Sequence, residues 1–313
     1  MKVIEHLEKA DGPLISFEVI PPERGGNFNS LLETIDDLTK FNPPFIDVTS
    51  HAADVNYEET LQGIKKVVRR KRPGTLGICA VIQHKYGIEA VPHILCLGFT
   101  REETEDFLIE LKYLGIENVL ALRGDEKYHK PVISGKSVNE HASDLVEQIA
   151  KMNRSCYLED IANPESSNFC IGVAGYPEKH FEAPNLRRDI ELLKGKVDAG
   201  ASYIVTQMFF DNQKYFDFVE RCRAERITAP IIPGLKIINC KNDIRIPKSF
   251  HIDIPYELSE EIRKAKKEEV LSIGVEWSSR QTQELIDAGV PAVHFYVMGD
   301  SNPVKQVLGK LRR

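Results

Sequence analysis

The sequence contains no long apolar segment and no closely spaced cysteines. Charged residues interrupt each apolar run well before the roughly 20 residues that a membrane-spanning helix needs. The amino-terminal segment MKVIEHLEKADG carries charges throughout and lacks the apolar stretch of a secretory signal. The cysteines are too widely spaced to suggest a disulfide framework: Cys79, Cys96, Cys156, Cys170, Cys222 and Cys240. We therefore expect a cytoplasmic protein whose thiols stay reduced.

Signature motifs of several enzyme classes are also missing. No GxGxxG sequence, P-loop or GxSxG elbow occurs, which argues against a Rossmann dinucleotide-binding fold, an NTPase and an α/β-hydrolase. No HExxH motif or Cys/His cluster has the spacing of metal ligands, so we predict no metal site. The formal net charge of −6, from 41 basic and 47 acidic residues, argues against a protein that binds nucleic acid or anionic membranes.

What the 313-residue chain does contain is a regular alternation of strand-like and helix-like segments. The helix-like segments carry apolar stripes, such as Leu31, Ile35 and Leu38, at a spacing of three or four residues. The strand-like segments are nearly continuous in apolar residues, as in strands buried on both faces. They lie at residues 14–20, 45–50, 75–83, 118–124, 169–175, 203–209, 231–236 and 292–298.

This alternation predicts an α/β fold of the (β/α)8 TIM-barrel class, with residues 1–313 forming a single domain. A doubly wound sheet is the alternative. The long connections at 125–140, 154–168 and 237–290 are where we expect elaborations of the barrel.

Local signals support the predicted helix boundaries. Thr100 and Glu103 have the spacing of a capping box at a helix start. Gly115, Gly200 and Gly289 each follow a helix-like segment just before a strand, where a left-handed residue ends the helix. We expect the basic run at 65–73 to form the solvated face and end of another helix.

Polar and ionisable residues concentrate where the predicted strands end, which is where barrel enzymes place their active sites. They are Glu18, Thr49, Ser50, His51, Gln83, His84, Arg123, Asp125, Tyr176, Gln207, Lys236 and Tyr296. Glu18 is the most unusual, because it interrupts the apolar strand LISFEVI. Burial there would raise the pKa of its carboxyl group and suit it to general acid catalysis, whereas pairing with a Lys or Arg would make it structural.

The segment ALRGD ends another predicted strand with Arg123, Gly124 and Asp125. Because this RGD tripeptide closes a core strand in a chain without a secretory signal, we reject a cell-adhesion function for it. Gly124 would let a ligand approach the backbone, and Arg123 could bind a phosphate or carboxylate. His93, in an apolar strand-like context, is on these grounds more typical of a structural histidine. A Schiff-base aldolase that uses Lys236 stays open as a weaker alternative.

Several segments together resemble the methylenetetrahydrofolate reductase family in its barrel-only bacterial form. The matching segments occur in the family's order across almost the whole chain: SFEVIPP (16–22), DVTSHA (47–52), PHILCLG (92–98), ALRGD (121–125), ASDLV (142–146), VAGYPEKH (173–180), KVDAGASYIVTQMFFD (196–211), IIPGL (231–235) and VHFY (293–296).

The resemblance implies a (β/α)8 flavoprotein that uses FAD to reduce methylenetetrahydrofolate to methyltetrahydrofolate with NADH or NADPH, in the one-carbon metabolism that supplies methionine biosynthesis. It implies that Glu18 is the general acid, that Asp125 is a catalytic carboxylate beside the flavin, and that Gln207 binds the pterin. The positions that match FAD contacts in the family are Thr49, His93, Arg123, Gly124, Asp125, His141, Ala142, Tyr176, His180, Asp189 and Lys196.

The sequence departs from the family pattern at two positions. Asp300 stands where an Arg often helps to hold the folate, and Asp243 stands where a Gln is frequent, so both make the folate-tail side more acidic. Family members form oligomers, and we expect a homo-oligomer. We expect no feedback by adenosylmethionine, which acts through a further domain of the eukaryotic members.

Three other functions stay open: a folate reductase that takes electrons from a partner protein, a pterin methyltransferase barrel without flavin, and a binding module that has lost catalysis. The sequence does not discriminate NADH from NADPH.

Overall fold

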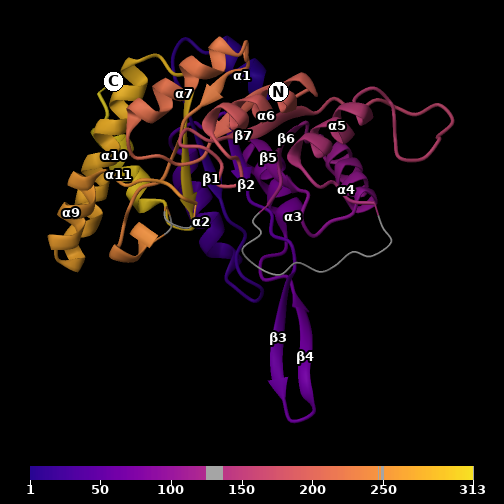
Figure 1. Ribbon diagram of the computed structural model, residues 1–313, viewed down its shortest axis with the longest axis horizontal. Coiled ribbons are helices and arrows are strands. Elements are labelled where there is room, and N and C mark those ends of the chain that lie inside the picture. Colours follow the sequence, from indigo (N-terminus) through magenta and orange to yellow (C-terminus); the bar gives the residue numbers. More distant parts are fainter. Residues whose placement is uncertain (125–136, 246, 248–249, 313) are drawn as a thin grey trace.

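A parallel β-sheet that returns on itself forms the centre of the molecule. The computed structural model describes residues 1–124, 137–245, 247 and 250–312. The sheet order is β10-β11-β1-β2-β5-β6-β7-β8-β9, and every pairing in it is parallel. Its two ends, β9 and β10, are successive pieces of one segment interrupted at Pro233. The structure therefore confirms the predicted (β/α)8 barrel, with helices arranged around the sheet (Figure 1).

The barrel strands are β1 (Leu14–Val19), β2 (Phe45–Val48), β5 (Glu89–Leu95), β6 (Asn118–Leu122), β7 (Cys170–Gly175), β8 (Tyr203–Thr206), β9 (Ile231–Ile232), β10 (Gly234–Leu235) and β11 (Ala292–Met298). The α-helices are α1 (Val3–Lys9), α2 (Phe28–Thr39), α3 (Thr75–Val81), α4 (Arg101–Tyr113), α5 (Ala142–Met152), α6 (Leu186–Asp198), α7 (Asn212–Ala224), α9 (Tyr256–Lys264), α10 (Val270–Asp287) and α11 (Asn302–Lys310). Short 3-10 helices lie at η2 (Lys241–Ile244) and η3 (Lys267–Glu269).

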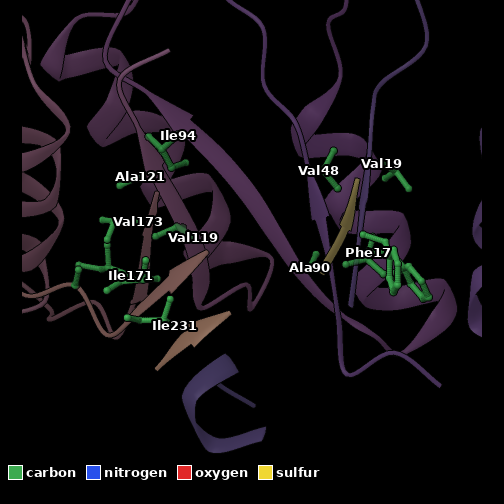
Figure 2. Packing of buried hydrophobic residues seen from close by; sticks show 14 of the residues in the cluster. Phe17, Val19, Val48, Ala90, Ile94, Val119, Ala121, Ile171, Val173 and Ile231 are labelled. Carbon is green, nitrogen blue, oxygen red and sulfur yellow. The ribbon is translucent and has the colours of Figure 1, made fainter. Parts of the chain in front are cut away.

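The two faces of each strand contribute to different parts of the core, because successive side chains point to opposite faces. Outward-facing residues, such as Phe17, Val19 and Val48, pack against the helices in the larger apolar cluster (Figure 2). Inward-facing residues form a second cluster inside the barrel: Phe45, Val91, Leu120, Cys170, Tyr203, Val205, Ile232 and Ala292. Apolar residues on both faces explain why the strands read as nearly continuous apolar runs.

Helix α1 closes the amino-terminal end of the barrel. Val3 belongs to the inner apolar cluster, and its backbone N–H donates a 2.8 Å hydrogen bond to the side-chain oxygen of the buried Asn118 at the start of β6. The side-chain amide of Asn118 donates in turn to the carbonyl of Met1. With one end covered by apolar side chains, ligands can reach the interior polar groups only from the carboxyl ends of the strands.

The prediction of a strand at 75–83 is wrong, because this segment is helical. Helix α3 covers Thr75–Val81, and a π-helix, η1, follows at Ile82–Tyr86. The buried residues Thr75, Ile78, Cys79 and Ile82 have helical spacing, which the density of apolar residues in the segment hides. The third barrel strand is β5 instead, and Gln83 and His84 are not strand-end residues.

The prediction of a helix end in the basic run at 65–73 is also wrong. Residues Gly63–Arg69 form β4, which pairs with β3 (Asp54–Thr60) in a separate antiparallel hairpin. This hairpin extends away from the barrel in Figure 1. Val67 and Val68 favour a strand, and Gly63, with φ +119°, permits the tight turn.

The predicted helix boundary signals are confirmed. Thr100 and Glu103 form a reciprocal capping box at the start of α4. Gly115, Gly200 and Gly289 all have positive φ where helices end. In the part of the chain that the structure describes, no helix combines the length and apolarity needed to cross a membrane.

The inner packing predicts the effect of a small substitution at Gly172 on β7. A Cβ atom there would lie 2.3 Å from the ring of Tyr203, a fully buried side chain on the adjacent strand. We expect Gly172→Ala to lower the free energy of unfolding by about 1–3 kcal/mol, measured by urea denaturation. The control is Gly195→Ala in α6, where no atom lies within 4 Å and the better helix former should raise stability by about 0.5–1 kcal/mol. Equal effects of the two substitutions would contradict this packing.

Candidate active site

Four adjacent strands, β11, β1, β2 and β5, place polar side chains inside the barrel. Leu14, Phe45, Val91 and Ala292 belong to the inner apolar cluster, so residues two or four positions further along each strand face inward as well. These residues are Ser16 and Glu18 on β1, Asp47 on β2, His93 on β5, and His294 and Tyr296 on β11. The barrel interior is therefore apolar near α1 and polar toward the carboxyl ends of these strands.

Glu18 lies at the carboxyl end of β1, next to an irregularity in the strand pairing. Glu18 is the register partner of Tyr296, but Val19 is the partner of Met298, so β11 contributes one extra residue. Met298 has a φ of +66°, which is uncommon for a residue with a side chain. Bulges of this kind change the direction of side chains and are frequent next to active sites.

The environment of Glu18 favours the protonated form of its carboxyl group. The residue is only 7% exposed, and burial raises the pKa of its carboxyl group to about 7. The electrostatic effects of His93 and Lys236 lower the pKa of Glu18 but do not cancel the effect of burial, which also lowers the pKa of the His93 imidazole. Glu18 can therefore hold a proton near neutral pH, which is the property that general acid catalysis requires.

Asp47 is a second buried carboxyl group, and it is not among the site residues predicted from the sequence. It is fully buried on β2 and is the register partner of Glu18. His93 Nε2 lies 3.4 Å from Glu18 Oε2 and 3.6 Å from Asp47 Oδ2. The signal that could have found Asp47 is the one that identified Glu18: a charged residue within an apolar strand, FIDV.

Hydrogen bonds hold the other polar residues of this half of the barrel. Ser16 Oγ and His294 Nδ1 are 2.9 Å apart, and burial lowers the pKa of His294 to about 3, so its imidazole is neutral. Tyr296 donates its hydroxyl to the carbonyl of Thr206 at 2.6 Å. Lys236 donates to the backbone carbonyl of Tyr296 at 3.1 Å. This lysine is held by the barrel and is not the free amine that a Schiff-base aldolase would present.

Asp243 and Asp300, the two departures from the family pattern, both act on Lys236. Burial lowers the pKa of the Lys236 ammonium group, and the charges of Asp243, Glu18 and Asp300 oppose that shift. Lys236, Tyr296 and Asp300 line one small pocket. The two additional carboxylates therefore lie in the field of a buried cation.

A second group of predicted residues lies around the ends of β6 and β7. The rings of Tyr176 and His180 meet edge to face, 4.6 Å between centroids. The backbone N–H of His180 donates a 2.8 Å hydrogen bond to the Asp189 carboxylate. Lys196 donates to the carbonyl of Ala174 at 2.7 Å, and burial lowers the pKa of its ammonium group to about 8, opposed by the charge of Asp189. Arg123 forms an ion pair with Glu182 beside this group.

The remaining predicted residues lie near these groups. Thr49 follows β2, and its buried hydroxyl has no hydrogen-bond partner among the described residues. Gly124 has a φ of +92°, a conformation that favours glycine. Gln207 accepts a 2.9 Å hydrogen bond from the N–H of Met208, and it lines the same small pocket as Tyr176.

Two of the predicted site residues, His141 and Ala142, have no contact among the described residues that joins them to either group. His141 is the N-cap residue of α5, and Ala142 is the first residue of that helix. Asp125 lies outside the residues that the structure describes. Within the described ranges, no group of three or more His, Cys, Asp or Glu side chains could hold a metal ion.

Comparison with known proteins connects this geometry to one family. The family model for methylenetetrahydrofolate reductase matches residues 2–312. The chain belongs to the methylenetetrahydrofolate reductase family. The 5,10-methylenetetrahydrofolate reductase of Salmonella typhimurium is 33% identical over 257 residues, which cover 82% of this chain and 75% of the relative. Methylenetetrahydrofolate reductase 1 of Schizosaccharomyces pombe is 32% identical over 300 residues, covering 95% of this chain but only 45% of the relative.

The chain thus spans less than half the length of this yeast member of the methylenetetrahydrofolate reductase family. Among solved structures, the barrel is similar to an uncharacterised protein from Clostridium thermocellum that is described as binding two copies of 5-methyl-5,6,7,8-tetrahydrofolic acid. The TM-score is 0.59 over 98% of this chain and 96% of that chain, with 11% sequence identity. At this identity the likeness shows the barrel fold alone.

The burial of Glu18 predicts a pH-dependent gain in stability when its charge is removed. Between the ordinary glutamate pKa of 4.5 and the folded value of about 7, the native protein binds more protons than the unfolded chain. The contribution of Glu18 to stability therefore falls as pH rises through this window. We expect Glu18→Gln to stabilise the protein by on the order of 2 kcal/mol more at pH 8 than at pH 5, measured by urea denaturation.

Glu33→Gln on the exposed surface of α2 is the matched control and should change stability little at either pH. A stability change for Glu18→Gln that is the same at both pH values would show that Glu18 is ionised throughout.

Proposed function

We propose that residues 1–313 form a flavin-binding catalytic domain that reduces 5,10-methylenetetrahydrofolate to 5-methyltetrahydrofolate, with NADH as the expected electron donor and NADPH as the alternative. The observation that carries this proposal is the buried Glu18, whose pKa is raised to about 7 at the carboxyl end of the barrel. In a chain of this family, a protonated acid at that place has a direct chemical use. The reduction requires protonation of a folate nitrogen so that the five-membered ring of the substrate can open.

Glu18 is the proton donor in this proposal. It transfers its proton to the ring nitrogen of methylenetetrahydrofolate, and the C–N bond at that nitrogen breaks to leave an electrophilic iminium carbon. The resulting Glu18 carboxylate lies within the field of Lys236 and His93, both of which favour its charged form. Gln207 supplies an amide that can both donate to and accept from the pterin. Its place beside Tyr176 in one small pocket supports this role.

The residues around β2, β6 and β7 fit an FAD molecule. Thr49 has a buried hydroxyl without a hydrogen-bond partner among the described residues, and a ligand can supply that partner. Gly124 permits close approach to the backbone, and Lys196 and Arg123 supply positive charge for a diphosphate. When bound, FAD supplies a two-electron carrier that accepts a hydride from the nicotinamide and passes it to the folate.

Residues Thr49, His93, Arg123, Gly124, Asp125, His141, Ala142, Tyr176, His180, Asp189 and Lys196 are the proposed FAD-binding set. The catalytic role of Asp125 rests on the family resemblance.

The visible absorption spectrum of the purified protein tests this function. We expect a flavin spectrum that bleaches anaerobically with NADH and returns when methylenetetrahydrofolate is added. NADPH is tested in parallel to identify the donor. A flavin that neither nucleotide reduces would favour a reductase that takes electrons from a partner protein. A protein that cannot be reconstituted with FAD would contradict the proposal and favour the methyltransferase alternative.

The same experiment with Glu18→Gln separates the two halves of the reaction. Bleaching by NADH should persist, because it needs no acid at this position. Reoxidation by the folate should slow by about 10²–10⁴-fold, the usual contribution of a general acid. Glu33→Gln serves as the control and should resemble the unaltered protein. Reoxidation at an unchanged rate would remove Glu18 from the mechanism.

A further inference from the structure

Asp47 is a buried ionisable group that the proposed reaction does not use. Its side chain is completely buried, and neither carboxylate oxygen has a hydrogen-bond partner among the described residues. A buried carboxylate without donors is costly, and buried carboxyl groups are ordinarily hydrogen-bonded or paired. Phe45, its inward-facing neighbour on the same strand, belongs to the inner apolar cluster, so Asp47 borders the apolar part of the barrel interior.

The position of Asp47 links it to Glu18 through one atom. Glu18 and Asp47 are register partners on adjacent strands, so their side chains lie side by side inside the barrel. His93 Nε2 lies 3.4 Å from Glu18 Oε2 and 3.6 Å from Asp47 Oδ2. The two carboxyl groups therefore compete for the same nitrogen of one buried imidazole.

We propose that Asp47 is a positioning residue for the acid: it shares His93 Nε2 with Glu18, so His93 cannot become an exclusive ion-pair partner of Glu18, and Glu18 keeps its proton for the substrate. This inference rests on the proposed function. Two carboxyl groups around one site cannot both ionise easily in a dry environment, so they titrate as a coupled pair. Without Asp47, the single remaining carboxyl group would lose its proton at lower pH.

The other titratable groups around this pair do not supply an alternative cation close to Asp47. The groups that face Asp47 and Glu18 from the surrounding elements are Cys79 on α3, Tyr203 on β8, His294 and Tyr296 on β11, and Lys236 after β10. His294 is neutral and bound to Ser16. Lys236 lowers the pKa of Glu18, whereas burial raises the pKa of Asp47.

The pH dependence of Asp47→Asn tests the proposal. Asparagine keeps the shape of the side chain but cannot ionise. We expect the rate of flavin reoxidation by methylenetetrahydrofolate to be unchanged within twofold at pH 5.5. At pH 8 the rate should be about tenfold lower, because the midpoint of the acid limb moves down by about one pH unit. Reduction by NADH should be unaffected at both pH values.

A purely structural role for Asp47 predicts something else: a rate that falls equally at all pH values, or one that does not change. Either outcome would overturn the proposal. Asp106→Asn on the exposed surface of α4 is the matched control. Asp47→Ser, which also removes the charge with a smaller side chain, gives a second test if the asparagine variant does not fold.

A titration without turnover separates this proposal from the proposed function. Carbon-13 NMR of side-chain carboxyl groups, with Glu18 assigned by its loss in Glu18→Gln, follows the Glu18 proton directly. The midpoint for Glu18 should be about one pH unit lower in Asp47→Asn than in the unaltered protein. An unchanged midpoint would refute the role of Asp47 even in an active reductase. A lowered midpoint in a protein that reduces no folate would retain that role and reject the proposed function.

Discussion

Burial of carboxyl groups inside a closed barrel is the constraint on which the rest of this structure depends. The strands enclose a space that is dry enough to raise the pKa of Glu18 to about 7 although the electrostatic effects of His93 and Lys236 act against the shift. In water the same group would be ionised at neutral pH and could donate no proton. Closure of the sheet through the interrupted segment β9–β10 and coverage of its far end by α1 produce this environment.

The distribution of polarity inside the barrel follows from strand register. Inside the barrel, the neighbouring strands β11, β1, β2 and β5 carry buried polar side chains toward their carboxyl ends, whereas the inward positions of β6 to β9 are small or apolar, apart from Asn118 and Tyr203. A bulge between β1 and β11 occurs next to Glu18, where the direction of one side chain matters most. Most of the proposed FAD-binding residues thus lie in another part of the same barrel end than the acid, and His93 lies between the two.

Much of the fold could be predicted from the sequence, because apolar strands alternate with amphipathic helices along most of the chain. The prediction of a strand at 75–83 was wrong because the apolar residues of this segment are dense enough to conceal their helical spacing. The hairpin of β3 and β4 was missed because two antiparallel strands outside the barrel break the repeating pattern.

The candidate site could also be predicted only in part. A carboxyl group within an apolar strand identified Glu18, and the same signal at Asp47 was overlooked because Asp47 comes before the end of its strand. The contacts between His180 and Asp189, and those of Lys196, could not be derived, since loop and helix positions around β7 depend on tertiary packing. The effect of the Asp243 and Asp300 charges on Lys236 likewise emerges only in three dimensions.

Neutron crystallography of the protein in heavy water at pH 6 tests the central claim most directly, because it shows where hydrogen isotopes are bound. Since burial raises the pKa of Glu18 to about 7, this account predicts a deuteron on the Glu18 carboxyl group at that pH. A bare Glu18 carboxylate facing a His93 ring with deuterons on both nitrogens would contradict it. In that case Glu18 would be half of an ion pair, and the barrel would contain no acid ready to protonate a folate.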